Sequence, residues 1–274
     1  IAIAESLANL VFAPIDGGLS GVSLSANWMW PCKNKGEDAR LYAAVEAVSE
    51  FACELGINIP TGKDSLSMTQ KYKDGVVFAP GTVIISASGE VTDVRKGVTP
   101  NLQKQIGSGL IYINLTDMPL ALGGSSFAQI LNKLGTDAPD IKNVAQFKTI
   151  FNAIQGLINQ DLILAGHDVS SGGLITTLLE MCFPENGVGI DANLNALQEN
   201  SLVKCLFAEN PALVLQVADV KNVQDILASQ GVQAIEIGTV TASNTLSVSL
   251  NDQETAFDIA ALRDVWYKTS YLLD

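Results

Sequence analysis

The segment Leu162–Phe183 reads LILAGHDVSSGGLITTLLEMCF, and it shows how the second half of this chain is built. Its apolar start predicts a short strand over Leu162–Ala165, and the apolar residues of Gly173–Phe183 recur at helical spacing. Two serines and two glycines join them, which is typical of a tight turn before a helix. A strand that passes directly into a helix predicts a fold in which helices cover a sheet.

The same alternation extends over the rest of the second half. Apolar, β-branched runs predict strands, and residues at helical spacing between them predict helices, several of which end near glycines. The predicted strands are Gly109–Leu115, Ala212–Ala218, Val232–Val240 and Leu246–Leu250, and the predicted helices are Ser125–Leu134, Val144–Ile158, Val220–Gln230 and Ile259–Leu272. We therefore expect an α+β fold with α/β-type alternation.

The first part of the chain forms a separate block. Its predicted elements are a helix over Ile1–Val11, a strand over Ser23–Trp30, a helix capped by Asp38 and stopped by Gly56, and a strand over Thr82–Ser88. A polar stretch from Gly97 to Gln105 is typical of a linker, and we expect proteolytic cleavage near Gly97–Gly107. Because the chain opens on Ile1 inside a helical pattern, without an initiator Met, we expect a piece cut from a longer protein.

The composition excludes several classes of protein. The net charge is −13, so the chain lacks the basic surface that a general nucleic-acid binder needs. Its apolar runs are too short to span a membrane and no signal-peptide pattern appears in the given sequence, so we expect a cytoplasmic protein without a membrane partner. The four cysteines are scattered and there is a single histidine, which favours free thiols and argues against a zinc site.

The sequence Gly62-Lys63-Asp64-Ser65 has a superficial likeness to a P-loop, whose lysine and hydroxyl hold phosphate and Mg²⁺. The first glycine of that motif is missing, and Asp64 stands where Ser or Thr is needed. From the residues alone, a polar turn between two strands is the favoured interpretation.

The stretch Ala165–Gly173 (AGHDVSSGG) is open to two interpretations. Glycines between a strand and a helix let backbone amides approach an anion, and Asp168 beside them could ligate a cation. Alternatively, Ser170 or Ser171 caps the helix and the glycines only shape the turn. A lone histidine such as His167 is more often structural than a catalytic base. Both interpretations stay open at this point.

Two further patterns are weak on their own. Glu5 and Asn9 are four residues apart, so they share one face of the first helix, where a carboxylate and an amide oxygen suit a hard cation. Such pairs are also common on solvated helix faces. Leu122–Ser126 (LGGSS) is another glycine turn before a helix, and a helix cap is its simplest explanation.

Five segments together resemble one family. They are SLSANWM (Ser23–Met29), GEDARLYAAVEAV (Gly36–Val48), IPTGKDSLSM (Ile59–Met68), LGGSSFAQ (Leu122–Gln129) and HDVSSGGL (His167–Leu174). In this order they are similar to segments of the phosphoribosylformylglycinamidine synthase family, and the resemblance runs along nearly the whole chain.

The resemblance implies a two-domain fold like that of aminoimidazole ribonucleotide synthetase. Residues 1–104 would be a truncated N-terminal-type domain, residues 105–257 a complete C-terminal-type domain that folds as a compact unit, and residues 258–274 a C-terminal helix. The chain resembles most of the second half of the duplicated synthetase region in the large form of the enzyme. The first synthetase half and the glutaminase domain would then be missing partners, and we expect self-association through the first block.

The resemblance also implies an activity for the full enzyme. The family converts formylglycinamide ribonucleotide to the formylglycinamidine in purine biosynthesis. ATP activates the formamide oxygen and ammonia from glutamine replaces it, so the enzyme is a carbon–nitrogen ligase that needs Mg²⁺ with ATP or ADP. We expect no product from this chain alone, and its catalytic residues stay unknown.

The site residues follow from the resemblance as well. Glu5, Asn9 and Asp168 correspond to the family's metal ligands, and Ser170 to a serine that contacts the nucleotide. The resemblance fixes no role for Lys63, which we predict as a further phosphate ligand. Ser171 stands where related sequences often have Asp, which removes one cation ligand. In the large enzymes this second site tends to keep a nucleotide as a structural element.

Two alternatives stand beside this assignment. The glycine turns could be purely structural, in a non-catalytic half that only completes the fold, and nucleotide titration separates these cases. Another member of the superfamily, such as aminoimidazole ribonucleotide synthetase itself, is disfavoured by GEDARLY and GKDSLSM.

Overall fold

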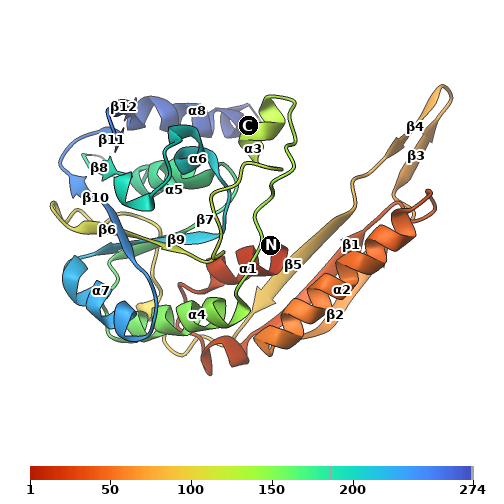
Figure 1. The fold of residues 1–274 in the computed structure, drawn as a ribbon, viewed down its shortest axis with the longest axis horizontal. Coiled ribbons are helices and arrows are strands. Elements are labelled where there is room, and N and C mark those ends of the chain that lie inside the picture. The colour runs from red at the N-terminus through yellow and green to blue at the C-terminus, as the bar shows by residue number, and fades with distance from the viewer. Residues whose placement is uncertain (185–186, 273–274) are drawn as a thin grey trace.

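Seven strands from the second half of the chain form one mixed sheet in the computed structural model, which describes residues 1–184 and 187–272 (Figure 1). The strands are β6 (Gly109–Asn114), β7 (Ala165–Val169), β8 (Gly189–Asn193), β9 (Ala212–Val217), β10 (Ile235–Thr241), β11 (Thr245–Leu250) and β12 (Gln253–Asp258). Their order is β12-β11-β8-β10-β6-β9-β7, with only the β8–β11 pair parallel. Strand β9 is buried along its whole length, as its mostly apolar sequence ALVLQV predicts.

Helices pack on both faces of this sheet, although one face of β8, β10, β11 and β12 stays open (Figure 1). They are α1 (Ala2–Leu10), α4 (Val144–Asn159), α5 (Gly173–Cys182), α6 (Leu202–Phe207), α7 (Val220–Ser229) and α8 (Ile259–Tyr271). A further short helix, α3 (Ser126–Ile130), contacts α6 through the stacked rings of Phe127 and Phe207. Helices α1, α4 and α7 share a hydrophobic cluster with Ile111 and Leu213, whereas α5, α6 and α8 share another with Leu110 and Tyr112. The two clusters separate because successive side chains of a strand point to opposite faces. The predicted α+β fold is therefore confirmed.

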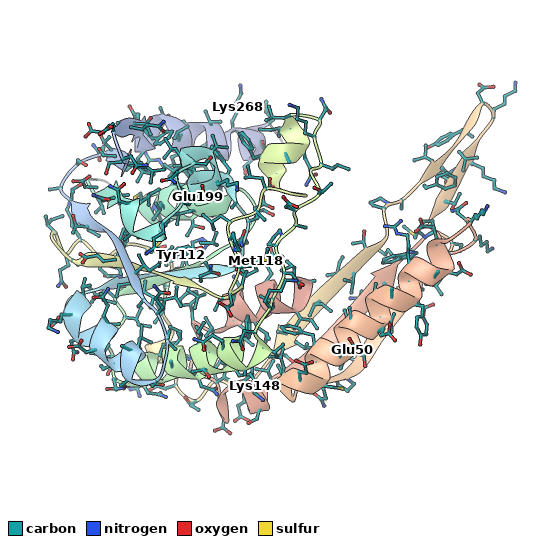
Figure 2. All side chains as sticks on the ribbon, viewed as in Figure 1. Glu50, Tyr112, Met118, Lys148, Glu199 and Lys268 are labelled. Atoms are coloured by element: carbon teal, nitrogen blue, oxygen red, sulfur yellow. The ribbon has the colours of Figure 1, made fainter. Side chains whose placement is uncertain are left out.

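The first block adds an arm that projects from this layered body (Figure 1). It contains β1 (Ser23–Met29), α2 (Glu37–Leu55), β2 (Asn58–Ser65), β3 (Thr69–Tyr72), β4 (Gly75–Phe78) and β5 (Thr82–Ser88), with short 3-10 turns at Gly18–Gly21 and Val94–Lys96. Strand β1 lies between its parallel partner β2 and its antiparallel partner β5, and β3 and β4 form a separate hairpin. Figure 2 shows Glu50 on the arm helix and Tyr112 in the body, where it is buried.

The arm joins the body at its inner end. Only Ala52 and Leu55 of α2 are buried, and both belong to the cluster around α4. The ring of Phe51 meets that of Phe147 edge-on, with 6.0 Å between centroids. The outer part of the arm therefore adds little to the core.

Two predicted elements of the body end or begin elsewhere. The helix expected over Ser125–Leu134 is α3, which ends at Ile130 because the chain turns and Asn132 takes a left-handed conformation (φ 55°). The strand expected over Leu162–Ala165 is β7, which begins at Ala165. Residues 165–169 pair with β9, so His167 and Asp168 lie in a strand and not in a turn.

The first block also differs from expectation. Helix α2 is capped by Gly36, whose φ of 85° suits glycine, and Asp38 lies in the first helical turn. The turn expected at Gly62-Lys63-Asp64-Ser65 is wrong, since these residues belong to β2 and pair with β1. The sequence did not predict this strand because most of its residues are polar and exposed. Main-chain pairing with β1 stabilises the strand, and burial of its side chains does not.

The elements that the sequence did not predict are β2, β3, β4, β8, β12 and α6. The expected strand over Val232–Val240 begins later, at Ile235. The final helix was expected within residues 258–274; α8 agrees with this, and residues 273–274 lie outside the described chain. Within the described ranges, no helix is long and apolar enough to cross a membrane.

The predicted linker Gly97–Gln105 has no regular structure but is held firmly. Leu102 is buried and its N–H donates to the carbonyl of Met181 at 3.0 Å. Gln216 accepts from the N–H of Gln103 at 2.7 Å and donates to its carbonyl at 2.8 Å. The segment is therefore bound to the surface of the second block.

Candidate functional site

Helix α1 lies beside strand β7, and this contact brings Asn9 to Asp168, 159 residues later in the chain. The Asn9 amide nitrogen Nδ2 donates to Asp168 Oδ1 over 3.5 Å, a long hydrogen bond. Glu5 lies one helical turn before Asn9 on the same face of α1. The three residues predicted as cation ligands therefore come together.

Two adjoining hollows lie at this meeting point. One, of about 540 Å³, runs between α1 and β5 and is lined by Glu5, Asn9, Asp168 and Ser170. The other, of about 270 Å³, lies against the two glycine turns and is lined by Glu5, Ser170 and Glu209. Because Glu5 and Ser170 line both, we treat the hollows as one cleft. These five residues define what we call the α1 cleft.

The α1 cleft is strongly acidic. The pKa of Glu5 is raised, first by burial and then by the negative charges of Asp168 and Glu209. Asp168 is itself buried. A cation in the cleft would relieve this repulsion, so the arrangement favours cation binding.

His167 precedes Asp168 on β7, and its ring lies between the carboxylates of Asp168 and of Glu180 on helix α5. Its Nδ1 lies 2.8 Å from the main-chain oxygen of Asp168 and 3.3 Å from Asp168 Oδ1, and its Nε2 lies 3.4 Å from Glu180 Oε2. Burial lowers the pKa of His167, but the bonds to Asp168 and Glu180 outweigh it and raise the pKa to about 9. The ring is therefore protonated at neutral pH, and both nitrogens can donate.

Glu209 joins the two glycine turns, and sequence reasoning missed it. Its Oε1 accepts from the N–H of Gly172 at 2.7 Å and from the N–H of Ser126 at 2.8 Å. The amide of Gly172, in the turn where amides were expected to approach an anion, thus holds a carboxylate of the chain itself. The local sequence does not predict this contact, because Glu209 lies 37 residues from Gly172 and 83 residues from Ser126 along the chain.

The two glycine turns differ in how the helix that follows each of them is capped. Ser125 caps α3 and accepts from the N–H of Ala128 at 3.2 Å, so the simple explanation of that turn is confirmed. Helix α5 is capped by Gly172 without a side-chain bond, so the serine cap expected there is wrong. Gly172 has a φ of 90°, and a Cβ at this position would clash with the Thr176 side chain, which explains the glycine.

Lys63 lies apart from the α1 cleft. It is on β2, which β1 separates from β5, and its Nζ donates to Ser65 Oγ at 2.7 Å. It lines neither of the two hollows. The structure thus brings together Glu5, Asn9, Asp168 and Ser170, and leaves out Lys63.

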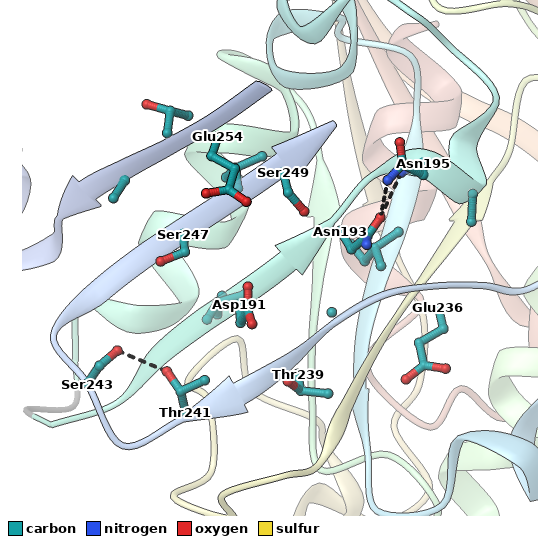
Figure 3. A pocket seen from close by; sticks show the side chains of 17 residues that line it. Asp191, Asn193, Asn195, Glu236, Thr239, Thr241, Ser243, Ser247, Ser249 and Glu254 are labelled. Carbon is teal, nitrogen blue, oxygen red and sulfur yellow. Dashed lines mark hydrogen bonds between the residues drawn. The ribbon is translucent and has the colours of Figure 1, made fainter. Parts of the chain in front are cut away.

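A wider hollow of about 1090 Å³ lies elsewhere, on the open face of β8, β10, β11 and β12 (Figure 3). Carboxylates and hydroxyls line it, among them Asp191, Glu236 and Glu254. Neither a predicted site residue nor one of the two glycine turns reaches it. Its size reflects an uncovered sheet face, and the α1 cleft remains the better candidate.

The α1 cleft offers donors that suit Mg²⁺: two carboxylates and an amide oxygen. In the part of the chain that the structure describes, no three His, Cys, Asp or Glu side chains are placed to hold a metal ion. Mg²⁺ usually binds one or two carboxylates together with water and phosphate oxygens, so the donors fit a cation that arrives with a nucleotide.

Two family profiles match the chain. The FGAR-AT PurM_N-like domain matches residues 1–90, and the C-terminal domain of AIR synthase related proteins matches residues 105–251.

Curated relatives agree with these profiles. The chain is 40% identical over 283 residues to the probable phosphoribosylformylglycinamidine synthase, chloroplastic/mitochondrial, of Arabidopsis thaliana, covering 100% of the chain and 20% of that protein. It is 40% identical over 252 residues to the probable phosphoribosylformylglycinamidine synthase of Caenorhabditis elegans, covering 88% of the chain and 19% of that protein. The chain spans about a fifth of the length of these relatives.

Solved structures share the fold. Thermotoga maritima PurL complexed with FGAR gives a TM-score of 0.71 at 10% identity, covering 93% of this chain and 40% of that one. The same protein complexed with ATP gives 0.66 at 11% identity, covering 95% and 39%. E. coli HypE, a hydrogenase maturation protein, gives 0.62 at 20% identity, covering 94% and 78%. At such low identity these likenesses show the fold alone.

Proposed function

The chain belongs to the AIR synthase related proteins, in the phosphoribosylformylglycinamidine synthase family, and on this basis we propose that its α1 cleft binds Mg²⁺ with ATP or ADP. We further propose that the chain serves the ATP- and glutamine-dependent conversion of formylglycinamide ribonucleotide to the formylglycinamidine. Because the chain spans about a fifth of its relatives, this activity belongs to the longer protein.

One observation carries the proposal: Glu5, Asn9 and Asp168 come from elements far apart in sequence and line one acidic hollow. Local structure does not require them to meet. The names of the Thermotoga maritima PurL structures support it, since they describe complexes with ATP, ADP and AMPPCP.

Four of the five residues of the α1 cleft have a proposed part in binding. Bound Mg²⁺ would neutralise phosphate charge. Glu5 and Asp168 supply carboxylate oxygens to it, and Asn9 supplies its amide oxygen. The hydroxyl of Ser170, at the end of β7, contacts the nucleotide. Lys63 stays a separate prediction, outside this cleft.

An observation also favours the structural alternative. Glu209 already satisfies one amide of each glycine turn, as it would in a half that only completes the fold. In the alternative, the acidic cleft binds no nucleotide. Nucleotide titration therefore decides between them.

A thermal-shift experiment tests the proposal. Mg–ADP at about 100 times its Kd stabilises the folded state by roughly 2.7 kcal/mol, which raises Tm by roughly 5–10 °C for a chain of this size. Asp168→Asn should reduce the shift because the anionic ligand is lost. Asp191→Asn, in the hollow of Figure 3, is the matched control and should respond like the parent. No shift in the parent, or equal shifts in parent and Asp168→Asn, would contradict the proposal.

The compartment follows from the family only in part. We propose the cytoplasm for this chain, whereas the name of the Arabidopsis thaliana relative places that protein in chloroplasts or mitochondria.

A further inference from the structure

A chain of polar contacts leads from Asp168 to the C-terminal helix. His167 lies between Asp168 and Glu180, as described above. Glu180, on α5, uses its other oxygen: Oε1 accepts from the indole Nε1 of Trp266 on α8 at 3.0 Å. Four side chains thus connect the α1 cleft to a helix that lines no part of it.

We propose that His167, Glu180 and Trp266 are positioning residues that fix the carboxylate of Asp168, so that its affinity for a cation depends on the docking of helix α8. This inference rests on the proposed function of the α1 cleft.

The contacts at Asp168 explain how positioning would work. Asn9 Nδ2 and His167 Nδ1 both approach Oδ1, at 3.5 Å and 3.3 Å. Among the described residues, none donates a hydrogen bond to Oδ2. Oδ1 is therefore flanked on two sides, and the shorter contact of His167 Nδ1, at 2.8 Å, goes to the main-chain oxygen of Asp168. The other carboxylate oxygen is left for a ligand.

Glu180 needs an anchor to hold His167. Its side chain is 28% exposed, so solvent competes for the carboxylate. The Trp266 N–H occupies one oxygen and directs the other toward His167 Nε2. Groups that orient a metal ligand typically change metal affinity 10- to 100-fold when they are removed.

Helix α8 contacts the residue that follows α5, so a change in the position of α8 can reach Glu180 on α5. The Trp266 ring lies against Phe183, with 6.0 Å between centroids, and the Arg263 guanidinium donates to the Phe183 carbonyl at 3.4 Å. Phe183 directly follows α5, the helix that carries Glu180. A displacement of α8 would therefore move the anchor of Glu180.

The test uses three variants and two measurements. Glu180→Gln removes the charge that faces His167, Trp266→Phe keeps an aromatic ring but removes the N–H, and Tyr271→Phe alters α8 at an exposed position as the control. The first measurement is the imidazole NMR signal of His167, the only histidine of the chain, in protein free of metal and nucleotide. The second is Mn²⁺ affinity in the presence of ADP, by electron paramagnetic resonance.

We expect the His167 signal to shift in Glu180→Gln and Trp266→Phe but not in Tyr271→Phe. Mn²⁺ affinity should fall roughly tenfold in Glu180→Gln and less in Trp266→Phe. An unchanged His167 signal in Glu180→Gln would overturn the contact chain whatever the metal does. A shifted signal with parental Mn²⁺ affinity would overturn the positioning role. A parent that binds no Mn²⁺ with ADP would contradict the proposed function itself and remove that role with it.

Discussion

At the scale of single residues, Glu209 holds two loops together. One carboxylate oxygen accepts from the amides of Ser126 and Gly172, at the starts of α3 and α5. Helix N-termini favour negative charge, so a carboxylate is well placed there. The same charge raises the pKa of Glu5 across the α1 cleft. Glu209 therefore shapes the cleft and contributes to its acidity.

Removal of this carboxylate should destabilise the fold. Glu209→Ala leaves two amides without their partner, and we expect the free energy of unfolding to fall by about 2 kcal/mol. Glu209→Gln keeps an acceptor oxygen and should lose less. Urea unfolding measures both, with Glu254→Ala as the control because Glu254 is exposed. Equal free energies of unfolding in Glu209→Ala and the control would show that the two hydrogen bonds of Glu209 do not stabilise the fold.

The site residues differ in how far sequence predicts them. Glu5 and Asn9 share a helix face, which spacing alone reveals. The glycine-rich turn suggested Asp168 as a possible cation ligand, and the family resemblance then assigned Asp168 and Ser170 to the same site. Glu209 was missed because its partners are loop amides brought close only by the folded chain. A contact between residues that are far apart along the chain produces no periodic pattern in the sequence.

At the scale of elements, the arm shows what hydrophobic patterning cannot detect. Strand β2 and the β3–β4 hairpin consist mostly of exposed residues, so no alternation of buried and exposed positions marks them. Main-chain pairing with β1, across the α2 crossover, defines β2 instead. Strands of the body such as β9 were predicted because they are buried on both faces.

Limited proteolysis should begin in the hairpin. Lys71 and Lys73 are exposed and lie in β3 and the following turn, which projects from the body (Figure 1). The sequence favoured cleavage near Gly97–Gly107, but the linker in that range is bound to the second block. We therefore expect trypsin to cut the hairpin first, because exposed loop tips open most readily.

A matched variant checks this result. Lys71→Gln combined with Lys73→Gln should remove the first cut without a large change in Tm, since both side chains are exposed. A first cut after Lys104, identified by mass spectrometry, would contradict the description of the bound segment.

At the scale of the whole molecule, one hydrophobic cluster crosses the predicted domain boundary. Ile3 and Leu7 of α1 belong to the same cluster as Ile111 and Phe147 of the second block. A chain limited to residues 105–257 would expose part of this cluster. Its independent folding stays a prediction, and we expect it to be less stable than the whole chain.

Self-association should occur through the arm. Val76, Val77 and Phe78 at the hairpin are 47%, 58% and 54% exposed, and Ile84 on β5 is 49% exposed. Exposed apolar surface of this kind favours association. Sedimentation velocity should show a species larger than the monomer at high concentration, and Val77→Thr with Phe78→Ser should weaken it. A parent that stays monomeric at the highest concentration would contradict the expectation.

The most direct test of the α1 cleft uses paramagnetic Mn²⁺ with ADP and the NMR signal of His167. Because the chain has a single histidine, its imidazole signal is assigned without further variants. His167 Nδ1 lies 3.3 Å from Asp168 Oδ1, so a Mn²⁺ ion bound to Asp168 must broaden that signal strongly. We predict severe broadening in the parent at low Mn²⁺ with ADP, and much less in Asp168→Asn. A His167 signal that stays sharp while Mn²⁺ and ADP bind would show that the cation lies elsewhere, and would contradict the site assigned here.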